Sequence, residues 1–83
     1  QNGLYDLAFR EFDKLLAANP RSAEAHNNRG NIYYTLNDYE RAFEAYAYAE
    51  ELDPADGGIK LNLALTQYQR GRLKEAIENL LRF

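Results

Sequence analysis

A repeat of 34 residues constrains this chain more than any other feature of its sequence. Ala8, Ala42 and Ala76 each lie in the same local pattern, with Tyr or Leu three positions earlier and Phe or Ile directly after. The same period places other residues in register: Pro20 with Pro54, Asn28 with Asn62, and Tyr34 with Tyr68. A fixed period of this length indicates stacked copies of one structural unit. We therefore expect an extended surface that holds a ligand rather than a pocket for chemistry.

The composition is that of a small folded domain. Of the 83 residues, 46% are apolar and 28% are charged, so we expect one domain with a modest core. The net charge of −3 argues against nucleic-acid binding, which needs a basic surface. No apolar run approaches the roughly 18 residues of a membrane span, so no membrane insertion is predicted. The chain has no Cys, which excludes a thiolate metal site. It also has no Met, which predicts that it is an excised fragment of a longer protein or a trimmed chain.

Apolar residues at spacings of three and four predict an all-α fold with about five helices. Asn19-Pro20 and Asp53-Pro54 should each end a helix, because the residue before proline is disfavoured in helical conformation. Ser22 is suited to cap the second helix, and either Asn37 or Asp38 the third. Gly71 should end the fourth helix, because glycine adopts positive φ at little cost. The expected helices span about residues 4–18, 23–35, 38 or 39 to 52, 56–70 and 72–83, joined by short links that favour antiparallel neighbours.

These residues resemble the tetratricopeptide repeat, whose first helix carries the pattern W-x₂-L-G-x₂-Y and whose second helix carries Ala, Phe and Pro markers. The middle unit has His26-x₂-Arg29-Gly30-x₂-Tyr33, followed by Ala42, Tyr46, Ala49 and Pro54. The next unit has Lys60-x₂-Leu63-Ala64-x₂-Gln67, followed by Ala76, Leu80 and Phe83. The resemblance implies a right-handed α-solenoid of 2.5 repeats in one domain. Residues 1–22 would be the second helix of a truncated repeat, 23–56 a full repeat and 57–83 a nearly full one.

Small residues should mark the places where paired helices cross. We expect Ala42 to lie close to Gly30, and Ala76 close to Ala64, because bulk at a crossing pushes the backbones apart. Larger side chains around the crossings should fill the core: Tyr33, Tyr39, Phe43, Tyr46, Leu63, Leu73, Ile77 and Leu80. The first helix has no partner of its own, so much of Leu4, Leu7, Phe9 or Leu16 should be exposed.

The resemblance implies a protein or peptide partner, held on the concave surface that the first helix of each pair lines. The residues expected there are Asn27, Asn28, Asn31, Tyr34, Leu61, Asn62, Leu65, Tyr68 and Gln69. In this family, asparagines such as Asn28 and Asn62 often hold the backbone of an extended peptide, since an amide both donates and accepts. The alternative is that these asparagines cap or bridge helices, and that Tyr34 and Tyr68 pack between repeats.

Self-association is the second functional hypothesis, because an unpartnered first helix exposes apolar residues. No enzyme activity, cofactor or metal site is predicted. His26 stands where the family has a large aromatic residue, and we interpret it as a packed ring. Lys60 and Arg70 are interpreted as solvated, and a chaperone-tail clamp is disfavoured because the required basic residues are replaced by Gly58 and Asn62.

Overall fold

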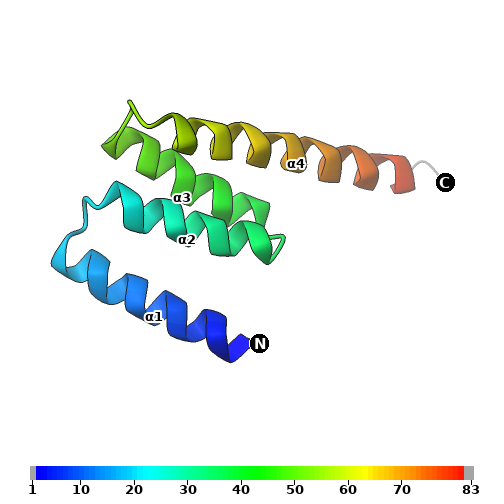
Figure 1. Ribbon diagram of the computed structural model, residues 1–83. Helices are drawn as coiled ribbons and strands as arrows, with labels where there is room; N and C mark the ends of the chain where they lie inside the picture. The colour runs from blue at the N-terminus through cyan, green and yellow to red at the C-terminus, as the bar shows by residue number, and fades with distance from the viewer. Residues whose placement is uncertain (1, 82–83) are drawn as a thin grey trace.

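The computed structural model describes residues 2–81, and this part of the chain is helical with no strands. The helices are α1 (Asn2–Ala18), α2 (Ala23–Thr35), α3 (Tyr39–Leu52) and α4 (Gly57–Leu81). Helices α1, α2 and α3 lie side by side, and α4 runs along α3 and then projects beyond the α2–α3 turn (Figure 1). The molecule therefore measures 50 × 33 × 15 Å. The all-α prediction is confirmed, with four helices in the described residues instead of five.

Side-chain caps explain where three of the helices begin. Ser22 Oγ accepts from the backbone N–H of Ala25 at 3.2 Å, which starts α2. Asp38 does the same for Arg41 N–H at 3.2 Å and starts α3. Asp56 Oδ1 accepts from Gly58 N–H at 2.8 Å at the beginning of α4. Each cap satisfies a backbone donor that has no partner within the helix.

The predicted break at Gly71 is wrong, because α4 continues through it to Leu81. Gly71 does not take a positive φ, whereas Asn37, one repeat earlier, has φ of 63° and ends the helical path there. The residue after Asn37 is the capping Asp38, but the residue after Gly71 is Arg72, whose side chain has no acceptor. A glycine inside a helix costs only about 1 kcal/mol. The helix therefore continues, and Ala76 lies about 18 Å along it from Ala64 instead of against it.

The core is built from small side chains around one tyrosine at the α2–α3–α4 contact. The buried apolar residues are Ala25, Ala42, Ala45, Tyr46, Ala49 and Ile59, with Thr66 also buried. A Cβ placed on Gly30 would lie 2.6 Å from Cε1 of Tyr46, so the ring of Tyr46 packs directly against Gly30. Ile59 and Thr66 were not predicted as core residues.

Several predicted core positions lie outside this core. Tyr33, Tyr39, Phe43 and Leu63 are half-buried, and Leu73, Ile77 and Leu80 are exposed because the helix that carries them does not fold back. Phe83 lies outside the described residues. On α1, Leu4 and Leu7 are exposed as expected, but Phe9 and Leu16 are half-buried. Phe9 stacks on Tyr33 with ring centroids 4.9 Å apart, which holds α1 against α2.

Candidate peptide-binding groove

A hollow lies between α2 and α4 and collects several residues of the predicted concave surface. It is lined by Asn31, Tyr34, Thr35, Tyr46, Asn62 and Leu65. The first three come from α2, Tyr46 from α3, and the last two from α4. We refer to this hollow as the α2–α4 groove. Tyr46 is the member that sequence reasoning placed in the core and not at the site.

Two asparagine amides in the α2–α4 groove are each fixed at one end. The hydroxyl of Tyr46 donates to Oδ1 of Asn31. Nδ2 of Asn62 donates to Oδ1 of Asn27 at 2.9 Å and so links α4 to α2. Asn31 is exposed and Asn62 is half-buried. The amide hydrogens of Asn31 and the Oδ1 atom of Asn62 are therefore oriented by bonds on the opposite side of each amide group.

Burial and hydrogen bonding make Tyr46 a fixed donor. Burial, with a smaller electrostatic contribution from Tyr34, raises the pKa of Tyr46 from 10.0 to about 12. A raised pKa favours the protonated phenol, so Tyr46 retains its O–H near neutral pH. The ring is only 2% exposed, and it forms the inner wall of the groove.

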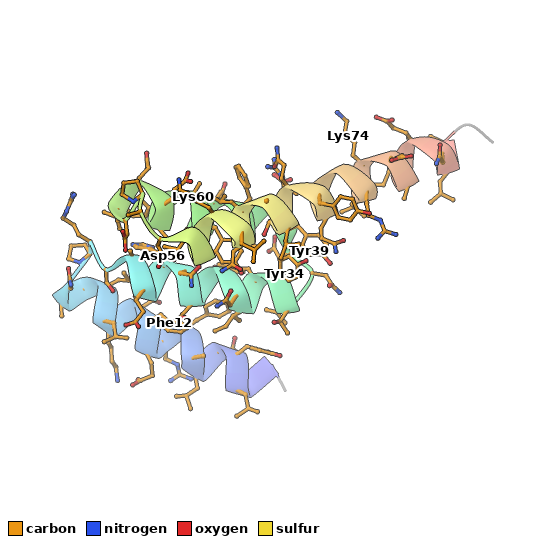
Figure 2. The ribbon with its side chains drawn as sticks, turned by 45° about the horizontal axis from the view of Figure 1, so that its top comes forward. Phe12, Tyr34, Tyr39, Asp56, Lys60 and Lys74 are labelled. Atoms are coloured by element: carbon orange, nitrogen blue, oxygen red, sulfur yellow. The ribbon has the colours of Figure 1, made fainter. Side chains whose placement is uncertain are left out.

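Tyr34 contributes both to packing and to the groove. Its ring meets that of Tyr39 edge-on, with centroids 5.3 Å apart and planes at 70°, and the two lie together close to the α2–α3 turn (Figure 2). This geometry is the one that aromatic pairs prefer. Tyr68, the equivalent residue on α4, is 61% exposed, and its ring centre lies 5.6 Å from Cζ of Arg72. Unlike Tyr34, Tyr68 does not line the α2–α4 groove.

Asn28 lies in a different hollow, although it is in register with Asn62. That second hollow is between α1 and α2 and is lined by Phe12, Leu15, Asn19, Ser22, Glu24, Ala25 and Asn28. Figure 2 shows Phe12 on α1, the helix that forms one wall of this hollow. Leu61 and Tyr68 are exposed and Gln69 is half-buried, and none of the three lines the α2–α4 groove.

Comparison with known families identifies the repeat. Two family models, both described as tetratricopeptide repeat, match residues 1–57 and 34–82. The chain belongs to the tetratricopeptide repeat family. Tetratricopeptide repeats generally mediate protein–protein interactions and are generally non-catalytic. The second match extends through Gly71, so the family pattern continues across the uninterrupted helix α4.

Two ion pairs at the exposed surface join α4 to α3 in this tetratricopeptide repeat; Lys60 is solvated as interpreted, whereas Arg70 is half-buried. Nε of Arg70 donates to Oε1 of Glu40 at 2.7 Å, and its guanidinium lies 4.3 Å from the ring centre of Phe43. Nζ of Lys60 lies 3.1 Å from Oε2 of Glu50. The partners are 30 and 10 residues apart, so helix periodicity alone could not associate them.

His26 is a packed ring of the repeat rather than part of a cluster. It is half-buried, its ring centroid lies 4.3 Å from that of Tyr48, and its Nε2 is 3.2 Å from the carbonyl oxygen of Pro20. Within residues 2–81, no group of three or more His, Asp or Glu side chains is arranged to hold a metal ion. Over the same range, none of the helices combines the length and apolar character needed to cross a membrane.

Proposed function

We propose that the α2–α4 groove binds a short extended peptide of a partner protein. The observation that supports this proposal most directly is the pair of pre-oriented amides. Asn31 would donate from Nδ2 to a peptide carbonyl oxygen, and Asn62 would accept at Oδ1 from a peptide N–H. One donor and one acceptor match one peptide unit, whatever its side chain. Tyr34 and Leu65 would add apolar contact for a neighbouring side chain.

The charges near the groove suggest a neutral peptide. The groove residues themselves carry no formal charge. Backbone recognition by neutral amides gives modest affinity, and a disordered peptide loses entropy when it is ordered, so we expect dissociation constants in the micromolar range. Acidic peptides should bind no more tightly than neutral ones.

Asn31→Asp tests the proposal with minimal disturbance of the fold. The carboxylate still accepts from Tyr46, but it replaces the two amide hydrogens with a second acceptor. A peptide is first selected from a random display library against the wild-type chain, and its affinity is then measured by fluorescence anisotropy. We expect Asn31→Asp to weaken binding by about 5- to 150-fold, which corresponds to an acceptor left without its donor.

Two matched variants control for charge. Asn79→Asp makes the same substitution on the exposed second half of α4, outside the groove, and should leave the affinity unchanged. Asn28→Asp makes it in the hollow between α1 and α2. If Asn28→Asp weakens binding and Asn31→Asp does not, the peptide lies against α1 and the α2–α4 groove is not the site.

Self-association is a second candidate function, and α4 favours it. Apolar side chains are exposed along both halves of this helix: Leu61, Leu65, Tyr68, Leu73, Ile77, Leu80 and Leu81. Contiguous exposed apolar surface is typical of protein interfaces. Because Phe9 and Leu16 of α1 are partly covered by packing, α4 is the stronger candidate of the two helices at the ends of the fold. Light scattering over a concentration series tests this, and a constant monomer mass would exclude it.

A further inference from the structure

The second half of α4 exposes side chains that the repeat pattern assigns to the core. Leu73, Ile77 and Leu80 are 52%, 49% and 73% exposed. This half projects beyond the other helices, as its residue Lys74 shows in Figure 2. Leu73 and Ile77 also line a hollow where α4 passes the start of α3. The first half of α4 is likewise uncovered on the side that carries Leu65 and Tyr68.

The contact between α2 and α3 shows how these two exposed surfaces fit together. In that pair, Tyr46 lies against Gly30 and donates to Asn31, and Tyr34 meets Tyr39 edge-on. Adding 34 to each number gives the equivalent pairs on α4: Leu80 with Ala64, Leu80 with Leu65, and Tyr68 with Leu73. A hydrogen-bonded Asn–Tyr pair in one repeat thus corresponds to a Leu–Leu pair in the next. Both members change from polar to apolar together, so the two halves of α4 remain complementary.

These complementary halves cannot meet within one copy of the continuous helix. Residues 64 and 80 are 16 positions apart, which is about 24 Å along an α-helix. When the α4 of a second copy runs antiparallel to that of the first, its second half lies beside the first half of the other helix, and its first half beside the second. Each second half then meets a first half, and the dimer contains two copies of the contact.

We propose that two copies of this chain exchange the second halves of α4. Residues 73–81 of each copy cover residues 57–70 of the other, with the twofold axis close to Gly71. This proposal rests on the self-association proposed above and adds its geometry. Residues 73–81 do not line the α2–α4 groove, but in the dimer they would cover Leu65, which does line it.

The α2–α3 turn explains why exchange is favoured over a fold-back within one chain. That turn uses Asn37 at φ of 63° and the cap of Asp38. At the equivalent positions, Gly71 can take the positive φ, but Arg72 cannot cap the following helix. Loss of a cap disfavours the turn by about fivefold. Glycine in a helix interior disfavours the continuous helix by a similar factor. The two conformations are therefore closely balanced, and the contacts between copies favour the extended one.

Cysteine crosslinking tests the exchange directly, because the chain contains no cysteine. Ala64→Cys and Leu80→Cys are made as two separate variants, one of them with an added tag that changes its mobility on a gel. The variants are mixed, unfolded and refolded together, and oxidised. We expect a disulfide-linked heterodimer of the two chain sizes in the mixture. Each variant alone should give little dimer, since equivalent residues lie about 24 Å apart across the axis.

Light scattering of the unmodified chain at the same concentration separates the outcomes. A dimer mass with the heterodimer crosslink supports the exchange. A dimer mass without that crosslink overturns the exchange and leaves self-association standing. A monomer mass overturns both. A double variant, Ala64→Cys with Leu80→Cys, that forms an internal disulfide in a monomer would show instead that the chain folds back at Gly71.

Two single substitutions should shift the dimer in opposite directions. Gly71→Ala favours the continuous helix about fivefold in each chain, and because the two conformations are closely balanced we expect the dimer to tighten by at most about fourfold. Arg72→Asp restores the cap of the α2–α3 turn and should weaken the dimer by at least about fivefold. Equal dimer affinities for these two variants would show that the hinge at Gly71 does not control association.

Discussion

Gly30→Ala is the sharpest test of the packing between α2 and α3. A Cβ at this position would lie 2.6 Å from Cε1, 2.7 Å from Cδ1 and 3.1 Å from Cζ of Tyr46. The ring cannot move away easily, because Tyr46 is 2% exposed and its hydroxyl is bound to Asn31. Overpacking of this kind costs about 1–3 kcal/mol. The better helix propensity of alanine offsets up to about 1 kcal/mol of that cost.

We therefore expect Gly30→Ala to lower the free energy of unfolding by about 1–2 kcal/mol, taking the net of the overpacking and propensity effects. For a domain of this size, that lowers Tm by roughly 5–15 °C. Circular dichroism at 222 nm, followed through thermal and urea unfolding, measures both quantities. Gly71→Ala is the matched control, because a Cβ at Gly71 has no neighbour within 4 Å and the substitution introduces no clash. The control should therefore gain stability.

A double variant separates the clash from other effects. The next repeat carries Ala64 and Leu80 where this one carries Gly30 and Tyr46. Gly30→Ala should therefore cost less in a Tyr46→Leu background, with a coupling of about 1–3 kcal/mol in the double-mutant cycle. If Gly30→Ala is as stable as Gly71→Ala, the ring of Tyr46 does not lie against α2 and the reasoning fails.

Three further tests concern single contacts. Ala42→Leu should destabilise by about 1–3 kcal/mol through overpacking, because Ala42 is fully buried, and an unchanged Tm would contradict that placement. Arg70→Ala should lower the free energy of unfolding by about 1 kcal/mol, since it removes an exposed ion pair with Glu40 and a cation–π contact with Phe43. Because salt screens the ion pair, 1 M NaCl should reduce this loss. A loss that does not depend on salt would show that only the cation–π contact contributes. The pKa of Tyr46 is about 12 in the folded chain and 10.0 in the unfolded chain, so the unfolded chain releases the phenol proton first. The stability that this difference contributes is fully present below pH 10 and is lost as the pH rises towards 12. Urea unfolding between pH 9 and 12 should show a steeper loss of stability for the wild type than for Tyr46→Phe, and parallel curves would exclude this linkage.

Part of the candidate site could be predicted from the sequence and part could not. The 34-residue period placed Asn31, Tyr34, Asn62 and Leu65 on first helices, and these four residues do line one groove. The period also treated Asn28 and Asn62 as equivalent, but α1 borders Asn28 and Asn27 binds Asn62. Equivalent positions in a repeat have the same backbone, but their neighbours differ near the ends of the array.

The sequence by itself determined where α1 ends, where α2 and α3 lie, and the caps of α2 and α3. Ser22, Asp38 and the two prolines act within a few residues of their own position, so their effects can be inferred without knowing the rest of the fold. Only the tertiary structure decided whether the chain turns at Gly71, because the continuous and the folded-back helix differ by a small local free energy. The Arg70–Glu40 ion pair and the Asn62–Asn27 hydrogen bond also join residues that are far apart in sequence. Such contacts form only once the helices are placed in space, since neither partner has a local preference for the other.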